Sequence, residues 1–288
     1  MNRLPVVKTH KLFIGGSFPR TESGRSRELL DLRGEVVAHL CRASRKDLRS
    51  AVEAARAAQP AWQAATPYLR GQVLHRFAEM LEGRRAELAD ALRTHARRSA
   101  ASARAEVDAA IDRLLSMAGW SDKLAMVLGG QNPVAGPYYN FTVPEATGVV
   151  TLVDGSHAPL LGAVSLLAPA LVAGNAVILV ASEAAPLPAL LLAESAPTSD
   201  LPPGVFNLLT GEHGELVPHI ASHRDIDGVL AAVEGETAAQ LRKGSAENLK
   251  RVRIIDPSSD FFAEEPWSGA SAFESLVEFK TIWHPAAT

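Results

Sequence analysis

The second half of the chain alternates apolar runs with helical segments, and this pattern limits the fold more than any other feature. Apolar runs predict strands at 149–153, 176–180, 205–209, 228–233 and 251–255. Helices are expected between them, at 160–173, 187–195, 216–222 and 235–243. Strands that are apolar along their whole length are buried on both faces, so the pattern predicts an α/β fold with a parallel sheet covered by helices on both sides. Such sheets bind ligands at the carboxyl ends of their strands.

The first half is mainly helical in character. Residues 11–18 suggest a short hairpin and residues 35–41 a strand. Ser44 is a plausible N-cap, with Asp47 completing a capping box, and the Ala-rich run that follows predicts a helix. Two further helical segments are expected at 67–94 and 101–127, where apolar residues recur at helical spacing.

The segments that flank the predicted sheet differ from it in amino-acid composition. In residues 128–145, Gly and Pro are followed by Tyr and Phe, which suggests an arm that leaves the domain and returns. We therefore expect one domain over residues 1–255 with this arm, a linker over 256–272 and a C-terminal strand within 273–288. A strand isolated at the terminus must pair with another element.

Composition excludes several classes of function. The chain has 288 residues and a net charge of −3, which argues against a dedicated nucleic-acid surface. Its one cysteine, Cys41, allows no internal disulfide, and its nine histidines show no metal-binding spacing, so no metal is expected. No signal-peptide pattern opens the chain, and the apolar region 158–181 is interrupted by polar residues and proline. A cytoplasmic protein is therefore expected.

Four aromatic residues near the carboxyl end allow two interpretations. They are Phe261, Phe262, Trp267 and Phe273. The group could form an exposed docking segment, or it could pack over the surface of the domain. We favour packing.

Several ordered motifs resemble the aldehyde dehydrogenase family. The most specific are LAPALVAGNAVILVASE and LPPGVFNLLTG, preceded by KLFIGGSF and YYNFTVPEATGVV and followed by the tail FKTIWHP. The resemblance covers residues 11–255 and the tail. It implies a Rossmann-like cofactor domain with N-terminal helices, whose arm and C-terminal strand serve oligomerisation. The catalytic domain that normally follows is not encoded in these residues.

The family's functional positions are altered in this sequence. His157 stands where the family has an asparagine that stabilises an oxyanion, and a loop or capping role is the alternative for it. Val180 replaces the lysine of the family's KPSE motif, which leaves Ser182 and Glu183 as the vestigial cofactor-binding candidates. Glu183 could instead be a solvated carboxylate at a helix start.

The phosphate turn and the general base are also changed. Val233 and Glu234 replace the glycine and serine of the family's phosphate-binding turn, and Glu236 adds a second carboxylate that would repel a pyrophosphate. Ile255 falls at the position of the general-base glutamate. No catalytic residue is therefore assigned, and no cofactor is expected unless vestigial binding of NAD or NADP survives.

Three functions remain open at this point. The favoured hypothesis is an inactive subunit that assembles with a full-length, catalytic aldehyde dehydrogenase in a hetero-oligomer. The second is a scaffold that associates with itself. The third is a residual NAD(P)-binding protein or oxidoreductase of the aldehyde dehydrogenase type, supported by His157, Glu183 and the helix termini. No nucleic-acid or membrane partner is expected.

Overall fold

A five-stranded parallel sheet organises the molecule. The computed structural model describes residues 6–31 and 33–286. The strands are β6 (Val149–Asp154), β7 (Ala176–Val180), β8 (Phe206–Leu209), β9 (Gly228–Ala232) and β10 (Arg251–Ile255). Their order is β10-β9-β6-β7-β8, so the order reverses at β6. The predicted α/β class and the position of every strand in this sheet are confirmed to within one residue.

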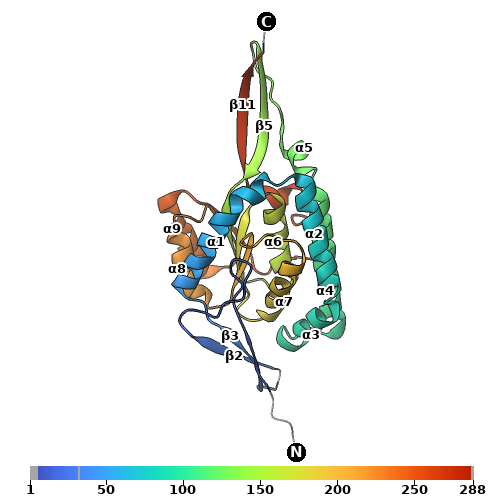
Figure 1. Ribbon diagram of the computed structural model, residues 1–288, viewed down its shortest axis with the longest axis vertical. Helices are drawn as coiled ribbons and strands as arrows, with labels where there is room; N and C mark the ends of the chain where they lie inside the picture. Colours follow the sequence, from blue (N-terminus) through green and yellow to red (C-terminus); the bar gives the residue numbers. More distant parts are fainter. Residues whose placement is uncertain (1–5, 32, 287–288) are drawn as a thin grey trace, which may run out of the picture.

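Helices cover both faces of the sheet (Figure 1). One face carries α1 (Arg45–Ala64), α8 (His213–Ser222) and α9 (Gly235–Ser245), packed on the β6 side chains Val149 and Val153. The other face carries α6 (Leu161–Val172) and α7 (Leu187–Ser195), packed on Val150 and Leu152. All twelve residues of α6 are buried, because further helices cover its outer side.

In the outer helical layer, two segments that were each predicted as one helix are each divided into two helices. The segment predicted as one helix at 67–94 forms α2 (Pro67–Glu82) and α3 (Arg85–His95), because the chain turns at Gly83 and Arg84. The segment predicted at 101–127 forms α4 (Ala100–Trp120) and the short α5 (Leu124–Leu128). The capping box of Ser44 and Asp47 is present at the start of α1, as predicted.

A small sheet lies beyond the carboxyl ends of the main strands. Its order is β1-β3-β2, formed by β1 (Lys8–His10), β2 (Ser26–Leu30) and β3 (Val36–Cys41). Only β3 was expected from the sequence. At residues 11–18 the chain makes a tight turn, with reciprocal backbone hydrogen bonds between Ile14 and Ser17. Phe13, just before that turn, forms a bridge with Leu208 of β8.

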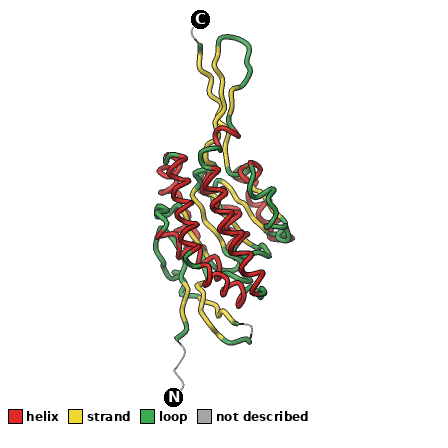
Figure 2. Tube along the Cα trace, turned by 90° about the vertical axis from the view of Figure 1, so that its right-hand side faces the viewer, coloured by secondary structure: helices red, strands yellow, loops and turns green. Residues whose placement is uncertain are grey.

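A narrow ribbon projects from the opposite end of the molecule (Figures 1 and 2). It consists of β4 (Gly130–Gln131), β5 (Tyr138–Ala146) and β11 (Val277–Pro285), in the order β11-β5-β4. The nine residues of β11 pair antiparallel with β5. The expected arm and C-terminal strand are therefore one structure.

Residues 256–276 pack against the domain instead of forming an extended linker. Phe261, Trp267 and Phe273 are buried, whereas Phe262 is half exposed. The guanidinium of Arg113 in α4 donates to the carbonyls of Phe261 and Ala263, at 3.0 and 3.1 Å. Packing, the favoured interpretation of the aromatic group, accounts for three of its four members.

Asn175 joins the start of the sheet to the base of the ribbon. Its side chain is fully buried, accepts a hydrogen bond from Gly148 N and donates to the carbonyls of Ala170 and Leu276. These contacts fix the point where the chain enters β6. Within the described residues, no helix is long and apolar enough to cross a membrane.

Candidate functional site at the carboxyl ends of the strands

A cleft of about 940 Å³ opens at the carboxyl ends of β6 and β7. Its floor is formed by the loops that follow these strands, including Ser156, His157, Ser182 and Glu183. One wall is the turn between β2 and β3, and the other is the turn between α3 and α4. This is the edge of a doubly wound sheet where ligands bind. The structure thus brings His157 together with both vestigial cofactor-binding candidates.

Glu183 is held by the chain itself. One oxygen of its carboxylate accepts a hydrogen bond from the backbone N–H of His213, the first residue of α8. Its backbone carbonyl accepts a hydrogen bond from Arg27 of β2, at 2.6 Å. The helix predicted at 216–222 begins three residues earlier than expected, at His213. The ring of His213 is buried, with Nε2 3.0 Å from the carbonyl oxygen of Ala181.

Glu106 of α4 holds the loop that follows β6. Its side chain is buried, and its carboxylate accepts hydrogen bonds from the backbone N–H groups of Leu160 and Leu161, at 3.0 and 3.4 Å. Arg98 lies 3.6 Å from the second carboxylate oxygen of Glu106 and also donates to the carbonyl of His157. The internal carboxylate therefore satisfies N–H groups at the start of α6, which helix starts otherwise leave without partners.

Asp154, the last residue of β6, is an unusual buried acid. Its side chain is fully buried, with one oxygen accepting a hydrogen bond from Ser156 N at 3.0 Å. The other oxygen has no hydrogen-bond partner within the described part of the chain. Burial raises the pKa of Asp154 to about 7, and the neighbouring Glu106 contributes in the same direction. Burial also raises the pKa of Glu106. This end of the sheet therefore holds two acids that resist ionisation.

Two exposed carboxylates give the start of α9 a negative charge. Glu234 is the N-cap residue of α9 but makes no capping hydrogen bond through its side chain. Glu234 and Glu236 are both exposed there, while Val233 is buried. These carboxylates interact favourably with the helix dipole and oppose the approach of a phosphate. Ile255, at the position of the family's general base, is buried at the end of β10.

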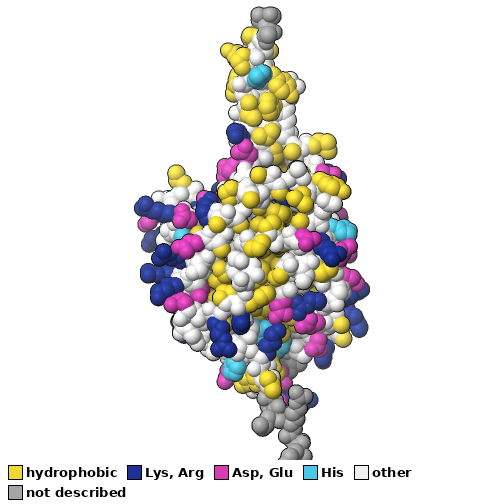
Figure 3. Space-filling view, in the orientation of Figure 1, with side chains coloured by type: hydrophobic (Ala, Val, Ile, Leu, Met, Phe, Trp, Pro, Cys, Tyr) yellow, Lys and Arg dark blue, Asp and Glu magenta, His cyan; other side chains and the backbone are white. Residues whose placement is uncertain are grey.

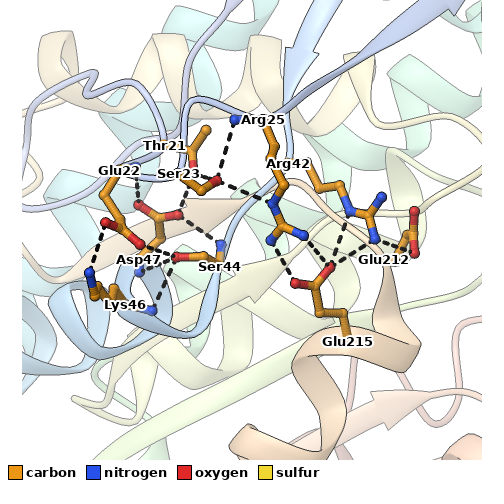
Figure 4. A network of polar contacts seen from close by, with 10 residues as sticks. All are labelled: Thr21, Glu22, Ser23, Arg25, Arg42, Ser44, Lys46, Asp47, Glu212 and Glu215. Atoms are coloured by element: carbon orange, nitrogen blue, oxygen red, sulfur yellow. Dashed lines mark hydrogen bonds and ion pairs between the residues drawn. The ribbon is translucent and has the colours of Figure 1, made fainter.

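A polar network anchors the β2–β3 wall of the cleft (Figure 4). Arg25 and Arg42 both donate to the carboxylate of Glu215 in the first turn of α8, at 2.6 to 3.3 Å. These hydrogen bonds, with Arg25 contributing most, lower the pKa of Glu215. Nearby, Asp47 accepts hydrogen bonds from Thr21 Oγ1 and from Ser44 N. The network ties the chain before β2 to the starts of α1 and α8.

Across residues 6–31 and 33–286, no group of three or more His, Cys, Asp or Glu side chains is placed to hold a metal ion. Cys41 is buried at the end of β3 and forms part of the apolar core around α1. This position fits a structural role for its side chain.

Comparisons with known proteins agree with the fold. The model of the aldehyde dehydrogenase family matches residues 21–255, so the chain belongs to that family. Mitochondrial aldehyde dehydrogenase of Sus scrofa is 32% identical over 260 residues, covering 88% of this chain and 49% of the relative. The putative aldehyde dehydrogenase DhaS of Bacillus subtilis is 30% identical over 251 residues, covering 85% of this chain and 50% of the relative.

Solved structures give the same result. The NAD+ complex of a Bacillus cereus aldehyde dehydrogenase superposes with a TM-score of 0.81 at 28% identity, covering 85% of this chain and 50% of that one. PnpE from Pseudomonas sp. WBC-3 also superposes with a TM-score of 0.81, at 26% identity. The chain therefore spans about half the length of the relatives it matches, and its sheet corresponds to part of a larger enzyme fold.

Sequence analysis missed several residues of this site. Glu106, Asp154, Arg97 and Arg98 were not singled out, although they line or support the cleft. An Asp-Gly pair at the end of an apolar strand and an Arg-Arg pair after a helix were the only local signals. Their proximity depends on α4 crossing α6, which no local pattern encodes.

Proposed function

We propose that this chain is a catalytically inactive subunit that assembles with a catalytic aldehyde dehydrogenase and stabilises or regulates it. The observation that carries the proposal is the projecting ribbon. Four of its aromatic side chains are exposed: Tyr138 and Tyr139 of β5 at 46% and 48%, Phe279 and Trp283 of β11 at 55% and 58%. Figure 3 shows hydrophobic side chains gathered along it. A ribbon of this size with exposed aromatic rings favours association with another chain.

The free edge of β11 supports the same proposal. Because β11 is the outer strand of its sheet, the backbone groups on one side of it are open to pairing with another strand. Charged side chains are concentrated near the base, where Lys280 pairs with Glu145 and Arg251 with Glu278. Towards the tip lie the exposed aromatic side chains of Tyr138, Tyr139 and Trp283, which suit a partner with an apolar surface.

The absence of activity is inferred from the altered cofactor positions. Glu234 and Glu236 place negative charge where the family binds a pyrophosphate, and Val180 cannot supply the ionic hydrogen bond of a lysine. Loss of such a bond weakens binding about tenfold or more. Ser182 and Glu183 remain in the cleft, but one oxygen of Glu183 is already engaged by His213.

Co-purification with a full-length aldehyde dehydrogenase from the same host tests the proposal. The tagged chain is expected to capture the enzyme, and a Phe279→Ser/Trp283→Ser variant is expected to lose it. A Leu115→Ser variant, altered at a partly exposed residue of α4 away from the ribbon, is the control and is expected to retain the enzyme. A monomeric chain that captures no such enzyme, or turnover of an aldehyde by the purified chain alone, contradicts the proposal.

A second copy of the chain is the alternative partner, because the same exposed ribbon could pair with itself. Size-exclusion chromatography with light scattering separates the two assemblies. A stable dimer or larger homo-oligomer that does not exchange with the enzyme favours a self-associating scaffold. Titration with NAD and NADP tests the third possibility, residual cofactor binding, which requires saturation at millimolar cofactor or below.

A further inference from the structure

We propose that the small sheet β1-β3-β2 is a pH-sensitive element, whose contact with α3 and α7 loosens when His10 and His95 become protonated. His10 is the last residue of β1, and His95 is the last residue of α3. Histidine is the side chain whose charge ordinarily changes between pH 5 and 8. Two imidazoles within one contact therefore make that contact responsive to mild acid.

The small sheet buries one of its faces against the helices. Leu29 of β2 and Leu40 of β3 belong to the same apolar cluster as Leu92 of α3. His10 is paired with Leu40 in the register of β1 and β3, so its side chain lies on the same face of the sheet. The residue is only 7% exposed. A positive charge at this position loses most of its hydration, which is unfavourable unless the charge gains a partner.

Neither imidazole has the partners that its charged form requires. Nδ1 of His10 is buried and has no hydrogen-bond partner within residues 6–31 and 33–286. Nδ1 of His95 is buried in the same way, and no acceptor for it is present in the described part of the chain. A protonated imidazole carries an N–H group on both nitrogens. Protonation therefore leaves a buried donor without an acceptor on each ring, which destabilises the contact.

The acid beside His10 is already engaged by two other cations. Oε1 of Glu194 in α7 lies 3.9 Å from Nδ1 of His10, beyond hydrogen-bond distance, and accepts a hydrogen bond from Lys8 Nζ at 3.0 Å. Oε2 of Glu194 accepts a hydrogen bond from Arg84 Nη2 at 2.8 Å. Glu194 can therefore offset only part of a new positive charge on His10, because Lys8 and Arg84 repel that charge.

The environment of His10 favours its neutral form. Burial lowers the pKa of His10, and the positive charges of Lys8 and His95 act in the same direction. The carboxylates of Glu194 and Glu87 oppose this shift without reversing it. Since each protonated histidine disfavours the other, the two rings act together on the contact.

His95 is shifted in the same direction. Burial lowers its pKa, while the backbone of Leu30 in β2 and the carboxylates of Asp90 and Asp31 oppose the shift. The folded chain therefore binds both protons less tightly than the unfolded chain, in which a histidine has a pKa of 6.5. The stability of the contact is complete above pH 6.5. It is lost as the pH falls through 6.5 towards the lower pKa values of the folded state.

The loss should be local, because the small sheet is held less firmly than the main sheet. β1 has three residues and β2 has five, and only one residue in each of these strands is buried. Every residue of β6, β7, β8 and β9 is buried. Segments with few buried contacts open before the core does. Acid is therefore expected to open residues 8–41 while the main sheet stays closed.

Hydrogen exchange of the full chain at pH 7.5 and 5.5, followed by mass spectrometry, tests this device. After correction for the intrinsic effect of pH, amides within residues 8–41 are expected to exchange at least about threefold faster at pH 5.5. Amides of α6 are expected to change less than about twofold. An unchanged rate in residues 8–41 overturns the proposal, and so does an equal acceleration in α6.

Matched variants assign the response to the two histidines. A His10→Gln/His95→Gln variant is expected to lose the acceleration, because glutamine stays neutral over this range. His75→Gln removes a histidine of α2 whose side chain is 61% exposed, and it is expected to keep the acceleration. Persistence of the acceleration in the double variant, or its loss in His75→Gln, contradicts the proposal.

The single variant His95→Gln decides the question if the double variant already exchanges fast at pH 7.5. It is expected to show a smaller acceleration than the wild-type chain, because one of the two buried charges no longer forms. An undiminished acceleration overturns the role of His95. These measurements need neither a ligand nor a partner enzyme, so they are separate from the test of assembly.

Discussion

The two ends of the central sheet differ in whether their side chains find partners within the same chain. At the carboxyl end, carboxylates and arginines of the same chain form the contacts of the cleft loops, as with Glu106 at the start of α6 and Glu215 at the start of α8. At the other end, the ribbon exposes Phe279 and Trp283 to solvent. The comparison indicates that the domain is complete in its own packing, whereas the ribbon is suited to contacts with another chain.

The core beneath the cleft should show the largest effect. Leu166→Ala in α6 is expected to lower the free energy of unfolding by about 2–5 kcal/mol, because the fully buried side chain leaves a cavity that its neighbours cannot fill. Urea denaturation followed by circular dichroism measures the change. A loss below about 1 kcal/mol would show that this layer is loosely packed. The domain could then no longer be contrasted with the ribbon as complete in its own packing.

The buried acid at the end of β6 should show an effect of similar size that depends on pH. The pKa of Asp154 is about 7 in the folded chain, above its ordinary value of 3.8, so the folded state binds the proton more tightly. Asp154 therefore contributes stability that is fully present below about pH 4 and is lost as pH rises towards 7. The contribution falls by about 1.4 kcal/mol per pH unit between these values.

Asp154→Asn is expected to remove this component and to stabilise the chain at pH 8. The measurement is the free energy of unfolding across pH 5 to 8, in parallel with Asp112→Asn, which alters an exposed residue of α4. If wild type and Asp154→Asn keep parallel pH profiles, Asp154 is not a buried acid of raised pKa.

The ribbon should show the smallest effect on the stability of the isolated chain. Trp283→Ala is expected to change the free energy of unfolding by less than about 0.5 kcal/mol, because the ring is 58% exposed and packs edge-on against Tyr138 of the same ribbon. Denaturation of the chain without its partner gives the value. A loss above about 2 kcal/mol would show that the ring stabilises the domain itself, and the contrast between the two ends would fail.

Much of the fold could be predicted because its signals are local. The apolar runs gave the strands of the main sheet, and Ser44 with Asp47 marked the start of α1. Breaks within helical segments were harder to predict, since Gly83 and Arg84 continue a helical pattern through a turn. The strands β1 and β2 were missed because they have only three and five residues, of which only His10 and Leu29 are buried, and so carry little apolar alternation.

The candidate site was only partly predictable. Ser182, Glu183 and His157 follow strands, so their position at the sheet edge could be expected, and the structure places all three in the cleft. The partners of these residues could not be found in the same way. His213 reaches Glu183, and Arg98 reaches His157, across 30 and 59 residues of chain.

By itself, the sequence determined the class of fold, the order of its elements and the exchange of cofactor-binding side chains for others. These properties follow from hydrophobic periodicity and from residue identity at motif positions. Only the tertiary structure decided which charges meet in the cleft, that residues 256–276 cover α4 and α6, and that β11 pairs with β5. Such contacts depend on packing between distant segments, because burial and hydrogen-bond geometry exist only once the helices and strands have been assembled.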